Sequence, residues 1–290
     1  MSEVLAIRLF LTICLTLVMG YPVAFVLGGV SLLFAMIGAA TGVFEPVFLQ
    51  ALPNRLFGIM NNQTLLAVPL FVFMGVMLEK SRVAEDLLES MSRLFGTLRG
   101  GLAISVCVVG ALLAASTGVV GATVVTLGLL ALPTMLRRGY DPAVATGTLA
   151  ATGTLGQIIP PSIILVLLGD VLSSAYQQAQ IRMGVFTPKT VSVGDLFIGA
   201  LIPGMILVGM YIAYLIFVAV TQPKKLPALP QEALGPIEWG RLFKALLPPL
   251  VLMGSVLGSI LAGVATPTEA ASLGAIGALV LALFKGQFNV

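Results

Sequence analysis

Histidine is absent from this sequence of 290 residues, and charged side chains make up only 9% of it. Histidine is the commonest general base near neutral pH and a frequent zinc ligand, so a serine-hydrolase triad and a typical zinc site are both disfavoured. A soluble domain carries about 25% charged residues. This chain instead has 58% hydrophobic residues and a mean hydropathy of +1.09, which indicates a membrane protein.

Cysteine is scarce, and basic residues form no stripe. Cys14 and Cys107 both lie in apolar stretches, and we interpret them as buried free thiols rather than as a disulfide or redox pair. The net charge of +3 comes from lysines and arginines scattered over polar segments. Because nucleic-acid binding needs a clustered basic face, we expect no nucleic-acid partner.

Long apolar stretches are abundant, and several reach the roughly 20 residues that a transmembrane helix needs. Backbone groups in lipid must be satisfied within the protein, so helices are the default, and the short alternating segments of a β-barrel are absent. We therefore expect an all-α polytopic membrane protein in the lipid bilayer. Its apolar segments are 4–19, 22–41, 57–78, 101–117, 118–136, 142–172, 195–221, 244–264 and 268–284.

Three regions follow from this pattern. Residues 1–100 hold scaffold-like N-terminal spans and, at 82–98, apolar residues at helical spacing that predict an amphipathic helix on the membrane surface. Residues 101–172 hold a hairpin and an interrupted span. Residues 173–290 begin with a polar stretch at 173–194, expected to be an outward loop, and end in further apolar spans.

The distribution of basic residues predicts the orientation of the chain. With alternating spans, one side of the membrane receives all but four of the 15 lysines and arginines. The positive-inside rule makes that side cytoplasmic, so the N-terminus is expected to be periplasmic. The four basic residues on the outer side are Arg8, Arg55, Arg182 and Lys189.

Residues 151–162, ATGTLGQIIPPS, interrupt an otherwise apolar segment. Two glycines favour unwinding, and two prolines lack the amide hydrogens that a helix needs. Carbonyls freed at membrane depth are tolerated only where they face protein or a cavity. The pattern is typical of a broken transporter helix whose ends hold ions and substrate, although a packing kink is the alternative. The hydroxyl-bearing residues that would add hard oxygen ligands are Thr152, Thr154 and Ser162.

The pair of apolar arms at 101–136 has no polar loop between them. Their tip, Ala115-Ser116-Thr117-Gly118, is small and uncharged, and arms of this length are near the lower limit for spanning. A re-entrant hairpin is therefore favoured over two crossings, while close helix packing is the other use of small residues. Gln157 is the large polar side chain of the interrupted span, and it would either orient substrate or tie down freed backbone.

Acidic residues lie at the ends of apolar segments or in polar loops, so a proton-relay carboxylate is not evident. Asp141 before Pro142 predicts a helix start, and Thr266 with Glu269 predicts a capping box. Asp141 and Asp170 would need to share one site to act as an aspartyl dyad, but a helix between them spans roughly 40 Å. We therefore expect that the protein is not an enzyme.

Four blocks of sequence carry a resemblance to a known family. The chain resembles the large membrane subunit of tripartite ATP-independent periplasmic (TRAP) transporters, the DctM-like family, from about residue 5 to 285. The blocks are AVPLFVFMG (67–75), GATVVTLGLLALPTMLRRGYDPAVATG (121–147), GTLGQIIPPSIILV (153–166) and ATPTEAASLGAIGALVLAL (265–283).

The resemblance implies an elevator-type secondary transporter in the bacterial inner membrane. Members of the family import organic anions, often carboxylates or sugar acids, together with Na⁺ as the coupling ion and without another cofactor. A periplasmic solute-binding protein (DctP-like) delivers the substrate, and a small membrane subunit (DctQ-like) partners the large one.

The resemblance also assigns site residues, with the first cation site between the hairpin tip and the broken helix. The cation-binding residues expected on this basis are Ser116, Thr117, Gly118, Thr152, Gly153, Thr154 and Pro160. The expected substrate-binding residues are Thr123, Gln157, Pro161 and Ser162.

The chain departs from the family pattern in one respect. The family has two inverted repeats, each with a hairpin and a broken helix, whereas this sequence shows one of each and no second proline-rich break after residue 162. We expect that the second repeat is missing from this chain and comes from more of the same polypeptide or from another one. The alternative is a non-transporting half-permease or assembly scaffold that needs a second chain.

Overall fold

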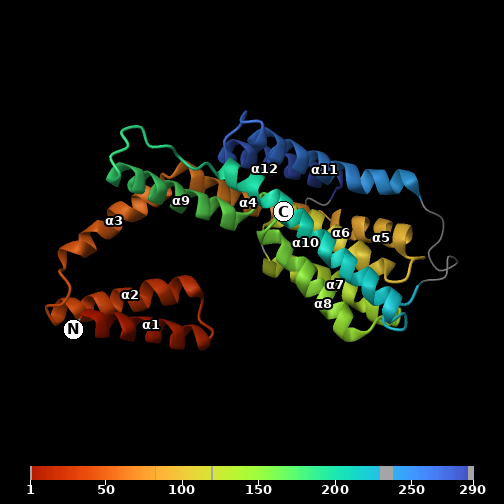
Figure 1. The fold of residues 1–290 in the computed structure, drawn as a ribbon, viewed down its shortest axis with the longest axis horizontal. Coiled ribbons are helices and arrows are strands. Elements are labelled where there is room, and N and C mark those ends of the chain that lie inside the picture. Colours follow the sequence, from red (N-terminus) through yellow and green to blue (C-terminus); the bar gives the residue numbers. More distant parts are fainter. Residues whose placement is uncertain (1, 82, 119, 229–237, 287–290) are drawn as a thin grey trace. The chain divides into compact units, whose positions relative to one another are not determined.

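The computed structural model describes residues 2–81, 83–118, 120–228 and 238–286. Within these ranges the chain is helical and contains no strand, so the expected all-α class is confirmed (Figure 1). Six of the described helices are long and apolar enough to cross a membrane. The protein is therefore a polytopic membrane protein, as its composition predicted.

The chain divides into two compact units, residues 1–62 and 63–290, each with its own packing. The first unit holds α1 (Ser2–Val18), α2 (Val23–Ala40) and α3 (Val47–Met60). Helices α1 and α2 pack against each other across a turn at Gly20, whose φ of +86° favours glycine. An apolar groove of about 300 Å³ lies between them and the Val43–Phe44 turn.

The second unit begins with α4 (Gln63–Lys80), which packs most extensively against α12 (Pro267–Phe284). The face of α12 toward α4 is built from small residues, which let two membrane helices approach closely. A Cβ on Gly274 would lie 2.5 Å from the sulfur of Met74 on α4. We call this face the small-residue seam; its buried members are Ala270, Ala271, Gly274, Ala275, Ala278 and Ala282.

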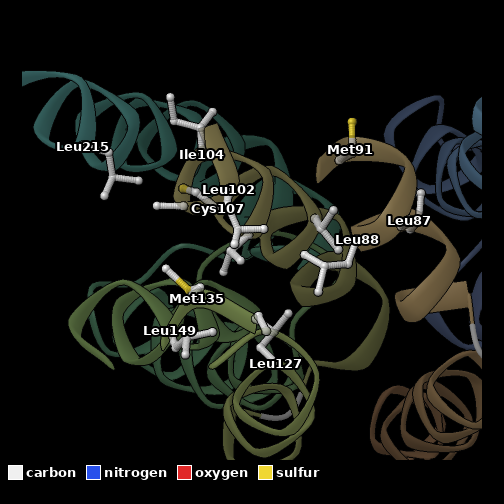
Figure 2. Close-up of a cluster of buried hydrophobic side chains, with 14 of the residues drawn as sticks. Leu87, Leu88, Met91, Leu102, Ile104, Cys107, Leu127, Met135, Leu149 and Leu215 are labelled. Atoms are coloured by element: carbon white, nitrogen blue, oxygen red, sulfur yellow. The ribbon is translucent and has the colours of Figure 1, made fainter. Parts of the chain in front are cut away.

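A second group of helices forms the larger apolar core. It contains α5 (Val83–Phe95), α6 (Gly101–Thr117), α7 (Val120–Arg137), α8 (Pro142–Thr154) and part of α10 (Val193–Thr221). Figure 2 shows side chains from these helices converging, among them Leu88, Leu102, Leu127 and Leu149. Helix α6 lies between α5, α7 and α8, so the predicted hairpin is packed on protein along much of its length.

Residues 83–95 of the stretch expected to be an amphipathic helix form α5, whose apolar face packs in the protein core. Ion pairs join α5 to α11 (Trp239–Leu261) and to Glu238 just before it. Glu89 accepts from Arg93 at 2.7 Å and from Arg241 at 3.1 Å. Glu238, at the start of α11, lies 3.4 Å from Arg93. Because these groups are largely exposed, each pair contributes little to stability by itself.

Two predicted helix starts are confirmed. Asp141 caps α8, with its carboxylate accepting from the amides of Ala143 and Val144 at 3.0 and 3.1 Å. Thr266 and Glu269 form the predicted capping box at α12, and the Glu269 carboxylate accepts from the Thr266 amide at 2.8 Å.

The loop expected at 173–194 is wrong over its first half. Helix α9 (Ile163–Arg182) continues through 173–182, and the chain leaves it only at Gly184, whose φ is +79°. The stretch is polar but contains no glycine or proline before Gly184, so nothing in it stops a helix. The side chain of Gln180 accepts from the Lys189 amide at 2.9 Å and donates to the Lys189 carbonyl at 3.0 Å, which closes the shorter loop.

The single apolar segment expected at 57–78 is also wrong. Helix α3 ends at Met60 and α4 begins at Gln63, so Asn61 and Asn62 separate two helices. The side-chain amide of Asn61 donates to the carbonyl of Phe57 at 2.9 Å and satisfies one free carbonyl at the end of α3.

Candidate functional site

The span 142–172 is broken, as its sequence predicted. Helix α8 ends at Thr154, a single 3-10 turn covers Leu155–Gln157, and α9 begins at Ile163. Ser162 caps α9, with its hydroxyl 3.5 Å from the Leu165 amide. The same hydroxyl donates to the Gln157 carbonyl at 2.8 Å, so Ser162 closes the irregular stretch onto itself.

The irregular stretch leaves backbone acceptors unused. Among the described residues, no hydrogen bond reaches the carbonyl oxygens of Ile159, Pro160 or Pro161. Both prolines are buried, so these carbonyls are not simply turned toward bulk water. Free carbonyls at membrane depth are favourable only when they face a polar group or an ion.

The tip of the hairpin meets this stretch. Gly118 follows α6 with a φ of +59°, which lets the chain reverse into α7. A Cβ on Gly118 would lie 3.4 Å from Ile163 and 3.7 Å from the Pro161 carbonyl oxygen. The side chains of Ser116 and Thr117 lie outside the described part of the chain, so their predicted role stays a prediction.

Gln157 ties the hairpin to the break. Its side-chain amide nitrogen donates to the Gly118 carbonyl at 2.6 Å. The sequence left two roles open for Gln157, orienting substrate or holding freed backbone. This hydrogen bond is of the second kind. The other side-chain atom of Gln157, its Oε1, is buried and has no hydrogen-bond partner among the described residues. That oxygen remains available to a ligand.

Thr152 lies beside Gly110 of α6, away from the hairpin tip. Its side chain is 1% exposed and fills the space where Gly110 of α6 has no Cβ, because a Cβ there would lie 2.0 Å from the Thr152 methyl group. Gly110 precedes Gly118 by about two helical turns, roughly 12 Å. The hydroxyl of Thr152 is near the Cys107 thiol but makes no hydrogen bond of acceptable geometry. Thr152 also lines a cavity of about 60 Å³ between α8 and α10, together with Tyr211 and Tyr214.

The other predicted residues separate into different environments. Gly153 packs against α7, since a Cβ on it would lie 2.2 Å from Val124. Thr154 is exposed, and its hydroxyl donates to the Ala151 carbonyl at 2.7 Å within its own helix. Thr123 is 2% exposed and borders a cavity of about 10 Å³ beside Glu79, away from the break.

The structure thus brings together part of the predicted set. Gly118, Gln157, Pro161 and Ser162 form one polar group at the tip, and Thr152 forms a second one near Gly110. Within the described ranges, no three residues among His, Cys, Asp and Glu cluster as metal ligands. A cation at either place would therefore be held by neutral hydroxyl and carbonyl oxygens.

The chain matches one family model over nearly its whole length. The model for "Tripartite ATP-independent periplasmic transporter, DctM component" matches residues 10–290. This chain belongs to the DctM family of TRAP transporter components. The resemblance seen in the four sequence blocks is confirmed, and the family is one of transporter permeases rather than enzymes.

Curated relatives in the DctM family include permeases for different solutes. A C4-dicarboxylate TRAP transporter large permease of Pseudomonas aeruginosa is 36% identical over 83% of this chain and 52% of its own length. The C4-dicarboxylate permease of Vibrio cholerae is 32% identical, over 95% of this chain and 55% of its own. An ectoine/5-hydroxyectoine permease of Ruegeria pomeroyi is 28% identical, over 96% and 59%. The chain thus spans about half the length of these relatives.

Proposed function

We propose that this chain is the N-terminal part of the large permease of a Na⁺-coupled TRAP transporter that imports an organic anion. It acts in the bacterial inner membrane with a periplasmic N-terminus. A DctP-like solute-binding protein delivers the substrate, and a DctQ-like small membrane subunit completes the permease. The hairpin and the broken helix belong to the moving part of an elevator mechanism.

The hydrogen bond from Gln157 to Gly118 carries this proposal. It joins the hairpin tip to the break, so the two interruptions of regular structure meet at one place. Half-helix ends and unwound carbonyls are the elements that transporters use to hold coupling ions and substrates. The free carbonyls at Ile159–Pro161 and the unpartnered Gln157 Oε1 are oxygen ligands of the kind that a hard cation such as Na⁺ prefers.

In this proposal the predicted site residues take different roles. Gly118, Pro160 and Pro161 contribute backbone oxygens to the group at the hairpin tip, while Thr152 contributes its hydroxyl to the second group, beside Gly110. Gly153 permits the close approach of α8 to the hairpin. Thr154, whose hydroxyl is used by its own helix, contributes at most its backbone. Ser116, Thr117 and Thr123 stay in the proposal on the family resemblance alone.

The proposal is tested by uptake into liposomes that hold the complete permease, with its small subunit inside the membrane and its solute-binding protein outside. The probe is radiolabelled succinate, a C4-dicarboxylate, with isethionate and ectoine as further candidates. We expect accumulation that requires both an inward Na⁺ gradient and the solute-binding protein. Accumulation that persists when choline replaces Na⁺ would overturn the coupling, and the absence of uptake for every organic anion would favour the scaffold alternative.

Replacing Thr152 with valine tests the hydroxyl assignment. Valine keeps the shape of threonine beside Gly110 but removes the unpartnered oxygen. Losing one ligand of a bound cation costs about 1.5–3 kcal/mol, and we expect the Na⁺ concentration for half-maximal uptake to rise about tenfold or more. Thr154→Val is the matched control, and its Na⁺ dependence should be unchanged. Equal shifts in both variants would contradict the assignment.

A further inference from the structure

A cavity of about 320 Å³ is bordered by α5, by the second arm of the hairpin, α7, and by the start of α6. The space is far larger than the roughly 10–15 Å³ that one water needs. None of its lining residues belongs to the site at the hairpin tip. Its polar lining consists of Glu85, Glu89, Ser92, Thr134 and Arg138.

The direction of the three helices decides which lining residues share one end of the cavity. Short connections join α5 to α6 and α6 to α7, so α5 and α7 both run antiparallel to α6 and parallel to each other. The Ser105 hydroxyl on α6 donates to the Met91 carbonyl on α5 at 2.8 Å. The Leu102 amide donates to the Tyr140 hydroxyl, just after α7, at 3.2 Å. The end of α5, the start of α6 and the end of α7 therefore lie together.

We call this end of the cavity the Arg138 end. Arg138 directly follows α7, and Thr134 precedes it by one helical turn, since the Arg138 amide donates to the Thr134 carbonyl at 3.1 Å. Ser92, near the end of α5, lies at the same end. Glu85 comes seven residues before Ser92, about 10 Å back along α5, and lies at the opposite end. The carboxylate of Glu85 and the guanidinium of Arg138 are therefore held apart.

Arg138 brings a donor without an acceptor to this end. Its side chain is half-buried, but its Nη1 atom is fully buried and has no hydrogen-bond partner within the described residues. A buried guanidinium nitrogen without an acceptor is costly, because it loses its hydration and gains nothing in return. The Thr134 hydroxyl, which can also donate, lines the cavity one turn away. The end of α7 therefore presents donors suited to an anion.

The second carboxylate that lines the cavity, that of Glu89, is already neutralised. It accepts from Arg93 at 2.7 Å and from Arg241 at 3.1 Å, so two guanidinium groups balance its charge. Arg138 forms no ion pair with any residue that the structure describes, and Arg137 beside it adds a second positive charge. The counter-ion of Arg138 therefore has to come from outside the described part of the chain.

We infer that the Arg138 end of this cavity binds a small oxyanion, a phosphate or a carboxylate. One oxygen accepts from Arg138 Nη1 and another from the Thr134 hydroxyl, while water fills the remaining space. An oxyanion offers several acceptor atoms to a guanidinium group, whereas chloride offers one. Leu88 and Leu130 line the space toward Glu85, which leaves room for the short carbon chain of an organic anion.

Such an anion has two sources. One is inorganic phosphate from the cytoplasm, and the other is the imported organic anion after its release. The second source, like the cytoplasmic position of the Arg138 end, rests on the function proposed above. Binding itself does not rest on it, because it needs neither Na⁺ nor the solute-binding protein. A binding measurement and an uptake measurement can therefore fail independently of each other.

Calorimetric titration of the purified complete permease with phosphate, succinate or chloride tests this inference. Potassium salts are used, so that the Na⁺-dependent site proposed above stays empty. We expect phosphate or succinate to bind with a dissociation constant on the order of 1 mM, as suits one guanidinium and one hydroxyl, and chloride to bind at least about tenfold more weakly. Arg138→Gln should weaken oxyanion binding at least about tenfold. Arg137→Gln removes the same charge from an exposed neighbour whose Nε donates to the Pro133 carbonyl, and it should change binding less than about twofold.

Arg138→Lys supplies the second variant, for the case that Arg138→Gln does not fold. Lysine keeps the charge but not the planar fork, so oxyanion binding should weaken by about threefold. Tighter binding of succinate would identify the released organic anion as the ligand, and tighter binding of phosphate would identify the inorganic ion. Equal losses for Arg138→Gln and Arg137→Gln would overturn the inference. Equal binding of all three anions to the unchanged protein, or no binding of any, would overturn it as well.

Discussion

Gln157→Met is expected to detach the hairpin tip from the broken helix. Methionine has a similar length and flexibility but no amide donor, so the buried Gly118 carbonyl would lose the hydrogen bond that it now accepts at 2.6 Å. Leaving a buried acceptor unsatisfied costs about 1–3 kcal/mol, which corresponds to roughly 5- to 150-fold in an equilibrium constant. We expect a loss of that size in apparent Na⁺ affinity during uptake.

The effect of Gln157→Met has a local signature as well. Amide hydrogen exchange around Gly118 should become faster, because the Gly118 carbonyl loses its hydrogen bond from the Gln157 side chain. Gln177→Met is the matched control, since its amide contacts only the Ser173 hydroxyl, at 3.4 Å on the outer part of α9. If both variants transport and exchange alike, Gln157 does not hold the tip.

Gly153→Ala should have the larger effect on stability. The new Cβ would lie 2.2 Å from a methyl group of Val124 and 3.1 Å from its Cα. Because one of these atoms is backbone, a rotation of the Val124 side chain cannot relieve the contact, and α8 must move away from α7. Overpacking of this kind costs about 1–3 kcal/mol or more, and we expect a fall of several degrees in the melting temperature of the purified protein.

Gly147→Ala is the control on the same helix. A Cβ at this position meets nothing within 4 Å, and alanine is the better helix former by about 0.8–1.0 kcal/mol, so Gly147→Ala should be neutral or slightly stabilising. Adding Val124→Ala to Gly153→Ala removes the blocking methyl group and should recover part of the loss. A double variant that is no more stable than Gly153→Ala would place the cause elsewhere.

The break in the span 142–172 could be predicted from sequence because glycine and proline act locally. Pro160 and Pro161 prevent regular hydrogen bonding whatever surrounds them, and Asp141 and Thr266 cap the helices that directly follow them. The partner of the break could not be predicted in the same way. Gln157 and Gly118 are 39 residues apart, and neither local sequence indicates that the two residues are in contact.

Helical periodicity could have shown that only one of the two threonines near the break, Thr152 and Thr154, faces the hairpin. Residues two apart on an α-helix point about 200° away from each other, so Thr152 and Thr154 cannot both face the hairpin. The structure buries Thr152 against Gly110 and exposes Thr154. Gly110 itself carried a usable signal, since a glycine inside an apolar arm is typical of a close helix crossing. Polarity misled the prediction at 173–182, where composition was interpreted as a loop although no residue ends the helix.

The small-residue seam of α12 limits which substitutions this helix can accept during evolution. On the face toward α4, side-chain volume decides which residues are tolerated, because a Cβ on Gly274 already meets the Met74 sulfur. On the opposite face, where Leu273 and Ile276 are exposed, compatibility with lipid decides instead. In a library randomised over α12, the face toward α4 should therefore tolerate only glycine, alanine and serine. The opposite face should tolerate any apolar residue.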